Sequence, residues 1–333
     1  MNGLVWAGFD VGKSKFSAAL DIPDVFGRKL ELPALSHKEF DRNEEGLEAF
    51  FVWASEKTSG PLSIVMETTG CYSQNLAYWI AEKRPEMHVS IVHAGSLSSY
   101  INSFRLGNKT DALDAKAIAR FGSERQPKAT KLPSEKQREL KELTRERTAL
   151  IEAKVDLMNR SESLKTSLVR EMNAQNIAVL MKRIEEFDKA IKELVVQDEE
   201  LHEEVRILDT MPGVSFISAY TILAELGSLK QYTRNELSAL SGLAPRIKQS
   251  GSSVNYSFMS RRSSGRTRQI LYINSLKGVE MVPVLNDMYH RLISRGKKKM
   301  QARCACMRKM LLMMRSMVIN NKPYDKNFHN FSS

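Results

Sequence analysis

The chain of 333 residues has only three cysteines, Cys71, Cys304 and Cys306. So few cysteines argue against a disulfide scaffold and fit a reducing compartment. Cys304 and Cys306 have no second His or Cys pair at ligand spacing, which favours two ordinary helix residues over half of a metal site. No run of 18 or more apolar residues is present, so no membrane span is predicted. The first residues show no secretory pattern, and we expect a cytoplasmic protein.

Acidic residues are scarce in the last third of the chain. Residues 212–333 carry 20 basic and 5 acidic side chains, whereas residues 1–130 carry 15 and 16, and residues 131–211 carry 15 and 18. The formal net charge of +11 therefore originates in the C-terminal third. A one-sided excess of this kind indicates a polyanionic partner, most commonly nucleic acid. A basic surface that only keeps the protein soluble is the alternative.

Proline and glycine are both missing between Pro133 and Pro212. Within this segment leucines recur every seven residues from Leu143 to Leu164. A second apolar stripe runs from Ile177 to Leu208 at spacings of three and four, and only Asp198 interrupts it. The pattern predicts two long helices in an antiparallel or intermolecular coiled coil. We expect these helices to serve spacing or dimerisation rather than chemistry.

The first 130 residues alternate between β-prone and helical stretches. Capping residues and apolar stripes predict helices at 43–57 and 74–83. Short apolar or alternating runs predict strands, and these lie at 4–12, 15–21, 62–67 and 88–93. This order indicates an α/β sheet with a leading hairpin.

Four carboxylates stand where such a fold forms sites. Asp10 and Glu67 each close an apolar strand, and active sites form at strand ends of open α/β sheets. Asp111 and Asp114 share one face at the start of a helix, where the helix dipole tolerates negative charge. Converging carboxylates repel unless a divalent cation neutralises them, and Mg²⁺ prefers such oxygens. Each residue alone is more often a turn or capping residue, but the set of four in this order is much more specific.

The last third begins with Pro212-Gly213, a tight turn before an apolar helix. This is half of a helix-hairpin-helix, whose backbone N–H groups can meet a phosphate, or a plain helical turn. Farther on, residues 245–269 hold seven serines, six Lys or Arg residues and no acid. Such a stretch is either a flexible basic linker or a serine placed among phosphate-binding cations. A methionine-rich stripe in the last helix is predicted to be core.

Five stretches together resemble the transposases of the insertion-sequence-110 (IS110) family, in the family's order and across essentially the whole chain. They are GFDVGKSKF, METTGCY, NKTDALDAKAIA, MPGVSFISAYTILAELG and GLAPRIKQSGSS. The resemblance implies a RuvC-like (RNase H-type) α/β domain at 1–130 and dimerising coiled-coil helices at 131–207. A mainly α-helical transposase domain at 208–320 and a polar tail at 321–333 would follow.

The resemblance also implies the site residues. Asp10, Glu67, Asp111 and Asp114 would bind Mg²⁺, or another divalent ion such as Mn²⁺. Ser250, the first serine of SGSS, would attack a DNA phosphorus and form a covalent phosphoserine bond that needs no ATP for rejoining. The chemistry alone does not separate Ser250 from its neighbours Ser252 and Ser253. Nearby cations would hold backbone phosphates: Arg246, Lys248, Arg261, Arg262, Arg266, Arg268, Lys297, Lys298 and Lys299.

Members of this family are guided by a structured noncoding RNA, the bridge RNA, which pairs with target and donor double-stranded DNA. The resemblance thus implies a guide RNA, a homo-oligomer that is a tetramer of two dimers, and a site shared between the acids of one subunit and the serine of another. Piv-type site-specific DNA invertases carry the same residues and remain an alternative. So do a metal-only nuclease of the Holliday-junction resolvase type and a nucleic-acid-binding scaffold with a decayed site.

Overall fold

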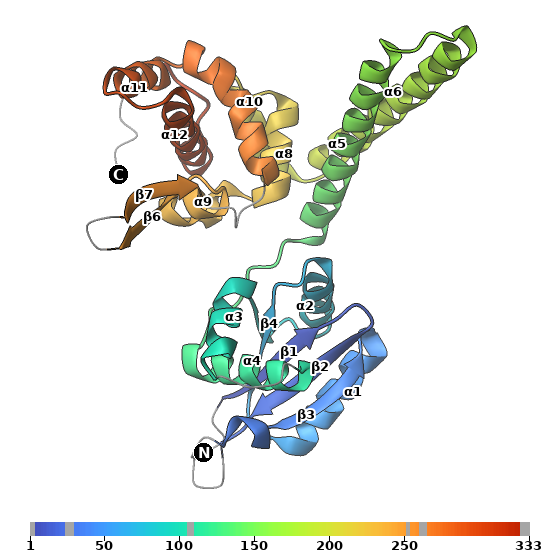
Figure 1. Cartoon of the computed structure of the whole chain (residues 1–333), viewed down its shortest axis with the longest axis vertical. Coiled ribbons are helices and arrows are strands. Elements are labelled where there is room, and N and C mark those ends of the chain that lie inside the picture. Colours follow the sequence, from blue (N-terminus) through green and yellow to red (C-terminus); the bar gives the residue numbers. More distant parts are fainter. Residues whose placement is uncertain (1–3, 24–29, 105–109, 251–253, 260–264, 327–333) are drawn as a thin grey trace. The chain divides into compact units, whose positions relative to one another are not determined.

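The computed structural model describes residues 4–23, 30–104, 110–250, 254–259 and 265–326 (Figure 1). For residues 245–250 and 254–259 it describes the backbone alone. The chain divides into two compact units, Met1–Leu132 and Pro133–Ser333. In the described ranges no helix is long and apolar enough to cross a membrane.

One mixed sheet forms the centre of the first unit. Its five strands are β1 (Val5–Val11), β2 (Lys15–Asp21), β3 (Ser36–Asp41), β4 (Leu62–Glu67) and β5 (His88–Val92). The strand order is β3-β2-β1-β4-β5. The first three strands pair antiparallel, whereas β4 and β5 continue the sheet in parallel with β1. The α/β sheet and its leading hairpin are thus confirmed.

Strand β3 was not predicted, because its sequence SHKEFD is mostly polar. The strand lies at the edge of the sheet, and Phe40 is its buried residue. Charged side chains on an edge strand discourage pairing with other chains. Because of these charges the strand contains no apolar run, and apolar runs were the basis for predicting strands.

Helices cover both faces of this sheet. They are α1 (Glu44–Lys57), α2 (Cys71–Lys83), α3 (Ala94–Ser103) and α4 (Asp111–Arg125), with a 3-10 turn, η1, at Leu32–Ala34. Phe9 and the other odd-numbered residues of β1 pack with Phe50 of α1 and Leu76 of α2. Trp6 of β1 instead packs with Val65 of β4 and Ile118 of α4. The first unit is therefore a three-layer sandwich with α4 on the face opposite α1 and α2.

A buried ion pair fastens α4 to the end of β2. Arg120 donates from Nε to Asp21 Oδ2 at 2.8 Å and from Nη2 to Asp21 Oδ1 at 3.1 Å. It also donates to the carbonyl of Leu30 at 2.5 Å, and the Ser123 hydroxyl donates to Asp21. Both charged side chains are almost fully buried. Every hydrogen bond of this group therefore matters, because a buried charge without partners is very costly.

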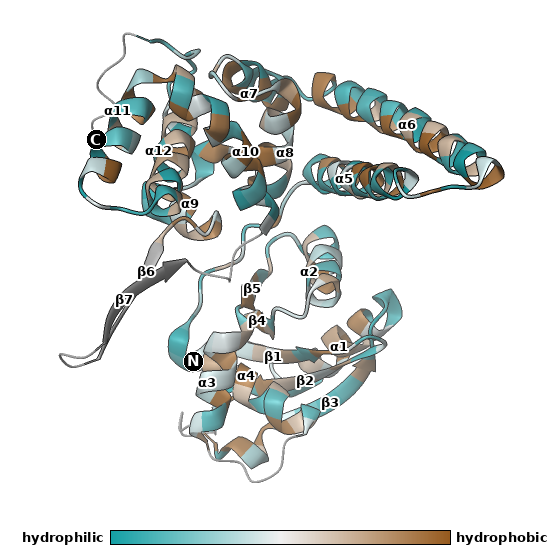
Figure 2. Ribbon diagram, turned by 45° about the horizontal axis from the view of Figure 1, so that its top comes forward, coloured by the Kyte–Doolittle hydropathy of each residue, from teal (hydrophilic) through white to brown (hydrophobic). Residues whose placement is uncertain are grey.

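A long helical hairpin opens the second unit. It consists of α5 (Glu135–Ser161) and α6 (Ser167–Val196), which lie side by side in both views (Figures 1 and 2). Arg147 and Asp188 join the two helices through hydrogen bonds of 2.5 and 3.2 Å. The two predicted long helices are thus present, while a partner chain and a dimeric coiled coil stay predictions.

The second apolar stripe of the sequence does not belong to one helix. Asp198 has extended backbone angles and caps a separate helix, α7 (Glu199–Asp209), by accepting from the Leu201 N–H at 3.1 Å. An aspartate at this position satisfies an otherwise unpaired backbone donor. The single interruption in the stripe is therefore the junction between two helices.

The remaining helices form the body of the second unit. They are α8 (Phe216–Leu226), α9 (Arg234–Leu240), α10 (Gly265–Met281), α11 (Pro283–Ser294) and α12 (Lys299–Ile319), with a 3-10 turn, η2, at Leu229–Gln231. Two strands, β6 (Pro245–Ser250) and β7 (Val254–Met259), pair antiparallel. Five methionines of α12 from Met307 to Met317 are buried in the core, as the sequence predicted.

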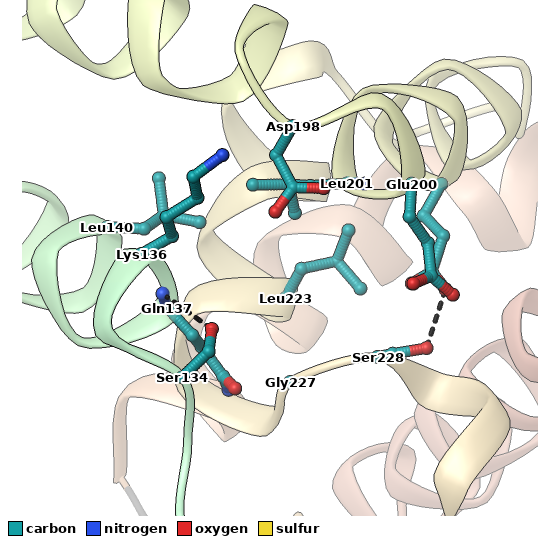
Figure 3. Close-up of a pocket in the computed structure, with 11 residues that line it drawn as sticks. Ser134, Lys136, Gln137, Leu140, Asp198, Glu200, Leu201, Leu223, Gly227 and Ser228 are labelled. Carbon is teal, nitrogen blue, oxygen red and sulfur yellow. Dashed lines mark hydrogen bonds between the residues drawn. The ribbon is translucent and has the colours of Figure 1, made fainter. Parts of the chain in front are cut away.

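A small cavity of about 140 Å³ lies beside the start of α5. Figure 3 shows Ser134 and Gln137 of this end facing Asp198 and Glu200 of α7, with Ser228 below. Glu204, also in its lining, is 2% exposed and accepts from the Ser228 hydroxyl at 2.5 Å. Burial raises the pKa of Glu204, and the hydrogen bond from Ser228 and the charge of Lys230 offset this only in part.

Replacing Arg120 with alanine should destabilise the first unit by roughly 3–5 kcal/mol, because Asp21 is left as an uncompensated buried charge. Lys83→Ala breaks the exposed pair with Glu44 and should cost under about 1 kcal/mol. Urea unfolding of the two variants measures both values. Equal small losses would contradict a structural role for the buried pair.

Replacing Glu204 with glutamine should change how stability depends on pH. The folded-state pKa of Glu204 lies above its ordinary value of 4.5, so the wild type gains stability as the pH falls through that raised pKa. If Glu204→Gln is more stable than the wild type at pH 7.5, this difference in stability should therefore shrink toward pH 5. The stability of exposed Glu193→Gln should change with pH as that of the wild type does. Thermal unfolding across this pH range provides the test, and parallel curves for all three proteins would contradict it.

Candidate functional site

Asp10 and Glu67 end neighbouring strands at the same level. In the parallel pairing of β1 with β4, Phe9 lies opposite Met66, and Asp10 and Glu67 are the next residues. Successive side chains of a strand alternate between faces. Asp10 therefore shares a face with Trp6 and Gly8, and Glu67 shares it with Val65, so both carboxylates lie on the face that α4 covers.

Helix α4 lies against β1 with no side chain between their backbones. A Cβ on Gly8 would lie 2.1 Å from the Ala119 nitrogen and 2.4 Å from the Ala115 oxygen. Closer to the start of β1, a Cβ on Gly122 would lie 2.7 Å from the Trp6 ring. Helix α4 thus runs antiparallel to β1.

This packing sets which turn of α4 lies beside Asp10. Two residues of strand advance by roughly 6.6 Å, which corresponds to about four and a half residues of helix. Trp6 lies at Gly122, and Gly8 lies between Ala115 and Ala119. One further step along β1 brings Asp10 level with the first turn of α4, which carries the other two carboxylates of the predicted set.

That first turn begins at Thr110, whose hydroxyl accepts from the Leu113 N–H at 3.3 Å. Asp111 is exposed, while Asp114, Asp10 and Glu67 are half-buried. The backbone thus carries all four predicted carboxylates to one edge of the sheet. Across the described residues, however, no three His, Cys, Asp or Glu side chains form a group that could hold a metal ion. The donor type suits Mg²⁺ or Mn²⁺, and a closed ligand set stays a prediction.

Ser250 is the last residue of β6 and pairs with Val254 of β7. The described strands of the serine-rich segment, β6 and β7, therefore pair as the two arms of a β-hairpin and are not a structureless linker. Ser252 and Ser253 lie outside the described residues. The hairpin belongs to the second unit and the acidic edge to the first.

The predicted nucleic-acid contacts are spread over the second unit. Arg246 and Lys248 are residues of β6, and Arg261 and Arg262 lie outside the described residues. Arg266 and Arg268 are half-buried in the first turn of α10. Lys297, Lys298 and Lys299 are exposed at the start of α12.

The turn at Pro212-Gly213 packs against α10. Gly213 has a φ of 88°, and a Cβ there would lie 2.6 Å from the Asn274 oxygen and from the Gly278 nitrogen. Close packing against α10 therefore accounts for a glycine at position 213, which agrees with a plain helical turn. A phosphate contact at this turn stays a prediction.

Sequence reasoning missed one cluster of cations. Lys141 and Arg145 of α5 surround the buried carboxylate of Glu225 on α8. They were not predicted to bind nucleic acid, because residues 131–211 carry a net acidic charge. Their spacing of four residues, which places them on one helix face, was the available signal.

Comparison with known proteins matches both units of the chain. The DEDD model of IS110, described as a transposase, matches residues 7–168, and the model of the transposase IS116/IS110/IS902 family matches residues 205–290. The pilin gene-inverting protein of Moraxella bovis is 26% identical over 97% of this chain and 98% of its own length.

Two further relatives show the same pattern. The pilin gene-inverting protein of Moraxella lacunata is also 26% identical, again over 97% of this chain and 98% of its own length. The transposase for insertion sequence element IS1111A of Coxiella burnetii is 23% identical over 62% of this chain and 63% of its own length. The chain therefore belongs to the IS110 family of transposases, which are DNA recombinases, and is related to the pilin gene-inverting proteins.

Proposed function

We propose that this recombinase cuts and rejoins DNA through a covalent bond between Ser250 and a DNA phosphate, at a divalent-metal site on the acidic edge of the first unit. The observation that carries the proposal is the shared face of Asp10 and Glu67 beneath the first turn of α4. Structural needs of the sheet do not explain four carboxylates at one edge, because like charges brought together repel.

Asp10, Glu67, Asp111 and Asp114 would hold the metal. Their carboxylate oxygens are hard ligands of the kind that Mg²⁺ and Mn²⁺ take. When bound, such ions polarise a phosphoryl oxygen and stabilise the entering and leaving oxygens. The carboxylates would orient the scissile phosphate, because they would hold the positive charge of the ions at one edge of a rigid sheet.

Ser250 would supply the nucleophile. Its Oγ forms a bond to phosphorus while the bond from phosphorus to one deoxyribose oxygen breaks. The serine proton is lost, and the leaving oxygen takes up a proton to become a hydroxyl. The number of phosphodiester bonds is unchanged, so a second DNA hydroxyl can reverse the step without ATP. Arg266 and Arg268, in the first turn of α10, would bind phosphate oxygens nearby.

The mixed sheet supports a RuvC-like first unit, because an antiparallel hairpin continued by two parallel strands carries the acids at strand ends. The resemblance extends the proposal to a bridge RNA guide and to a tetramer in which the acids of one subunit meet Ser250 of another. The basic C-terminal third supports nucleic acid as the partner. In this reading α5 and α6 would serve as the dimerising helices between the two catalytic parts.

A site-specific DNA invertase is the second candidate. The pilin gene-inverting relatives match nearly the whole chain at 26% identity, and the proposed chemistry is the same. An invertible cassette beside the coding region would favour this candidate, whereas element ends that flank the gene would favour transposition. A metal-only nuclease would instead use water and leave no protein–DNA bond.

Ser250→Ala should abolish the protein–DNA adduct, because the attacking oxygen is removed. Duplex DNA from the flanks of the coding region, labelled at its ends, would be incubated with the protein, Mg²⁺ and RNA transcribed from the same flanks, and run on a denaturing gel. Ser252→Ala and Ser253→Ala are the matched controls and should keep the adduct. An adduct that survives in Ser250→Ala but disappears in one control would move the nucleophile to that serine. Cleavage without any adduct in the wild type would favour the water-using nuclease.

Asp10→Asn and Glu67→Gln should each slow strand cleavage by at least about 100-fold, because a charge that fixes the metal is lost. Glu39→Gln, on the exposed edge strand β3, is the control and should cleave at the wild-type rate. Both site variants should bind duplex DNA as the wild type does. They should also lose the rise in melting temperature that Mn²⁺ gives the wild type. Undiminished cleavage in Asp10→Asn would overturn the assignment of this edge.

A further inference from the structure

The Glu225 carboxylate on α8 is surrounded by more positive charge than it can neutralise. Its side chain is 2% exposed. Arg145 of α5 donates to it from Nε at 2.9 Å and from Nη2 at 3.1 Å, and Lys141 Nζ lies 3.9 Å away. Arg266, from the first turn of α10, also acts on Glu225 through its charge. Two cations therefore contact one carboxylate, and the charge of a third acts on it.

The pKa shifts in this cluster reflect burial beside opposite charges. Burial raises the pKa of Glu225, but the hydrogen bonds from Arg145 and the charges of Lys141, Arg145 and Arg266 outweigh burial and leave the pKa low. The pKa of Lys141 is lowered, first by burial and then by Arg145, although Glu225 acts in the opposite direction. By formal charge, the one carboxylate of Glu225 faces the two contacting cations Lys141 and Arg145.

Two of the cations remain open to solvent. The side chain of Arg145 is 46% exposed and that of Lys141 is 31% exposed. Glu225 lies beneath them and holds the Arg145 guanidinium in one orientation through two hydrogen bonds. A second anion can therefore approach from the solvent side without displacing Glu225, and it would meet cations that are already positioned.

We propose that Lys141, Arg145 and Arg266 together bind a backbone phosphate of duplex DNA, so that the DNA-contacting surface extends from the serine hairpin onto α5. This inference rests on the proposed function for the identity of its partner. A phosphodiester fits because it is a small, singly charged anion whose oxygens match a guanidinium fork. Duplex DNA is favoured over RNA because DNA is the substrate of this family of recombinases.

The position of the cluster supports the same partner. Arg266 is the second residue of α10, and five residues separate that helix from the end of the hairpin that carries Ser250. A phosphate bound at the cluster would hold a DNA strand within the same unit as the nucleophile. Helix α5, for which the sequence predicts a role in spacing or dimerisation, would then also contact bound DNA.

Lys141→Gln is the informative variant. It removes one charge and keeps the bidentate bond between Arg145 and Glu225, so the fold is retained. Binding of a 30-base-pair duplex of arbitrary sequence would be measured between 50 and 200 mM salt. The slope of log affinity against log salt should become less steep by about 1, as expected for one lost phosphate contact. Lys141→Arg keeps the charge and should restore the wild-type slope.

Lys189→Gln is the matched control. Lys189 is an 80% exposed lysine of α6, and its variant should keep the wild-type slope. An unchanged slope in Lys141→Gln, or the same loss in both variants, would overturn the proposal. A loss seen with a single-stranded RNA of equal length but not with the duplex would assign the cluster to RNA instead. Binding requires no strand cleavage, so this test and the Ser250 adduct test fail independently.

Discussion

The direct contact between the backbone of α4 and Gly8 of β1 is the constraint on which the candidate site depends. Because no side chain separates the two elements, the helix cannot shift along the strand without a backbone clash. The buried pair of Arg120 and Asp21 holds the same helix at its other end. The first turn of α4 is thereby held beside Asp10, and Asp10 lies level with the turn that carries Asp111, although 101 positions separate the two in the sequence.

Much of this arrangement could be predicted from the sequence. Strands β1, β2, β4 and β5 were visible as apolar or alternating runs, and Asp10 and Glu67 stood out because each closes such a run. The contact at Gly8 could not be predicted, since a glycine inside a strand does not reveal which element approaches it. Strand β3 was hidden for the opposite reason, because an exposed edge requires polar residues.

The second unit shows a similar division. The methionine stripe of α12 and the two long helices α5 and α6 follow from periodicity, which left open whether the helices pair within one chain or between chains. Asp198 was visible as an interruption, but a stripe of apolar residues continues across a helix break as easily as along a helix. The spacing of Lys141 and Arg145 showed only that they share a helix face, because charge summed along α5 cannot reveal a contact with Glu225 of α8.

The ribbon of β6 and β7 has a consequence for when the enzyme can act. A sheet of only two strands has little stability of its own, and Ser250 lies at the end of this one. Alignment of the hydroxyl would then depend on whatever docks against the ribbon. With Ser250 as the nucleophile proposed above, strand cleavage would require prior assembly on the substrate, and an unassembled subunit would leave DNA uncut.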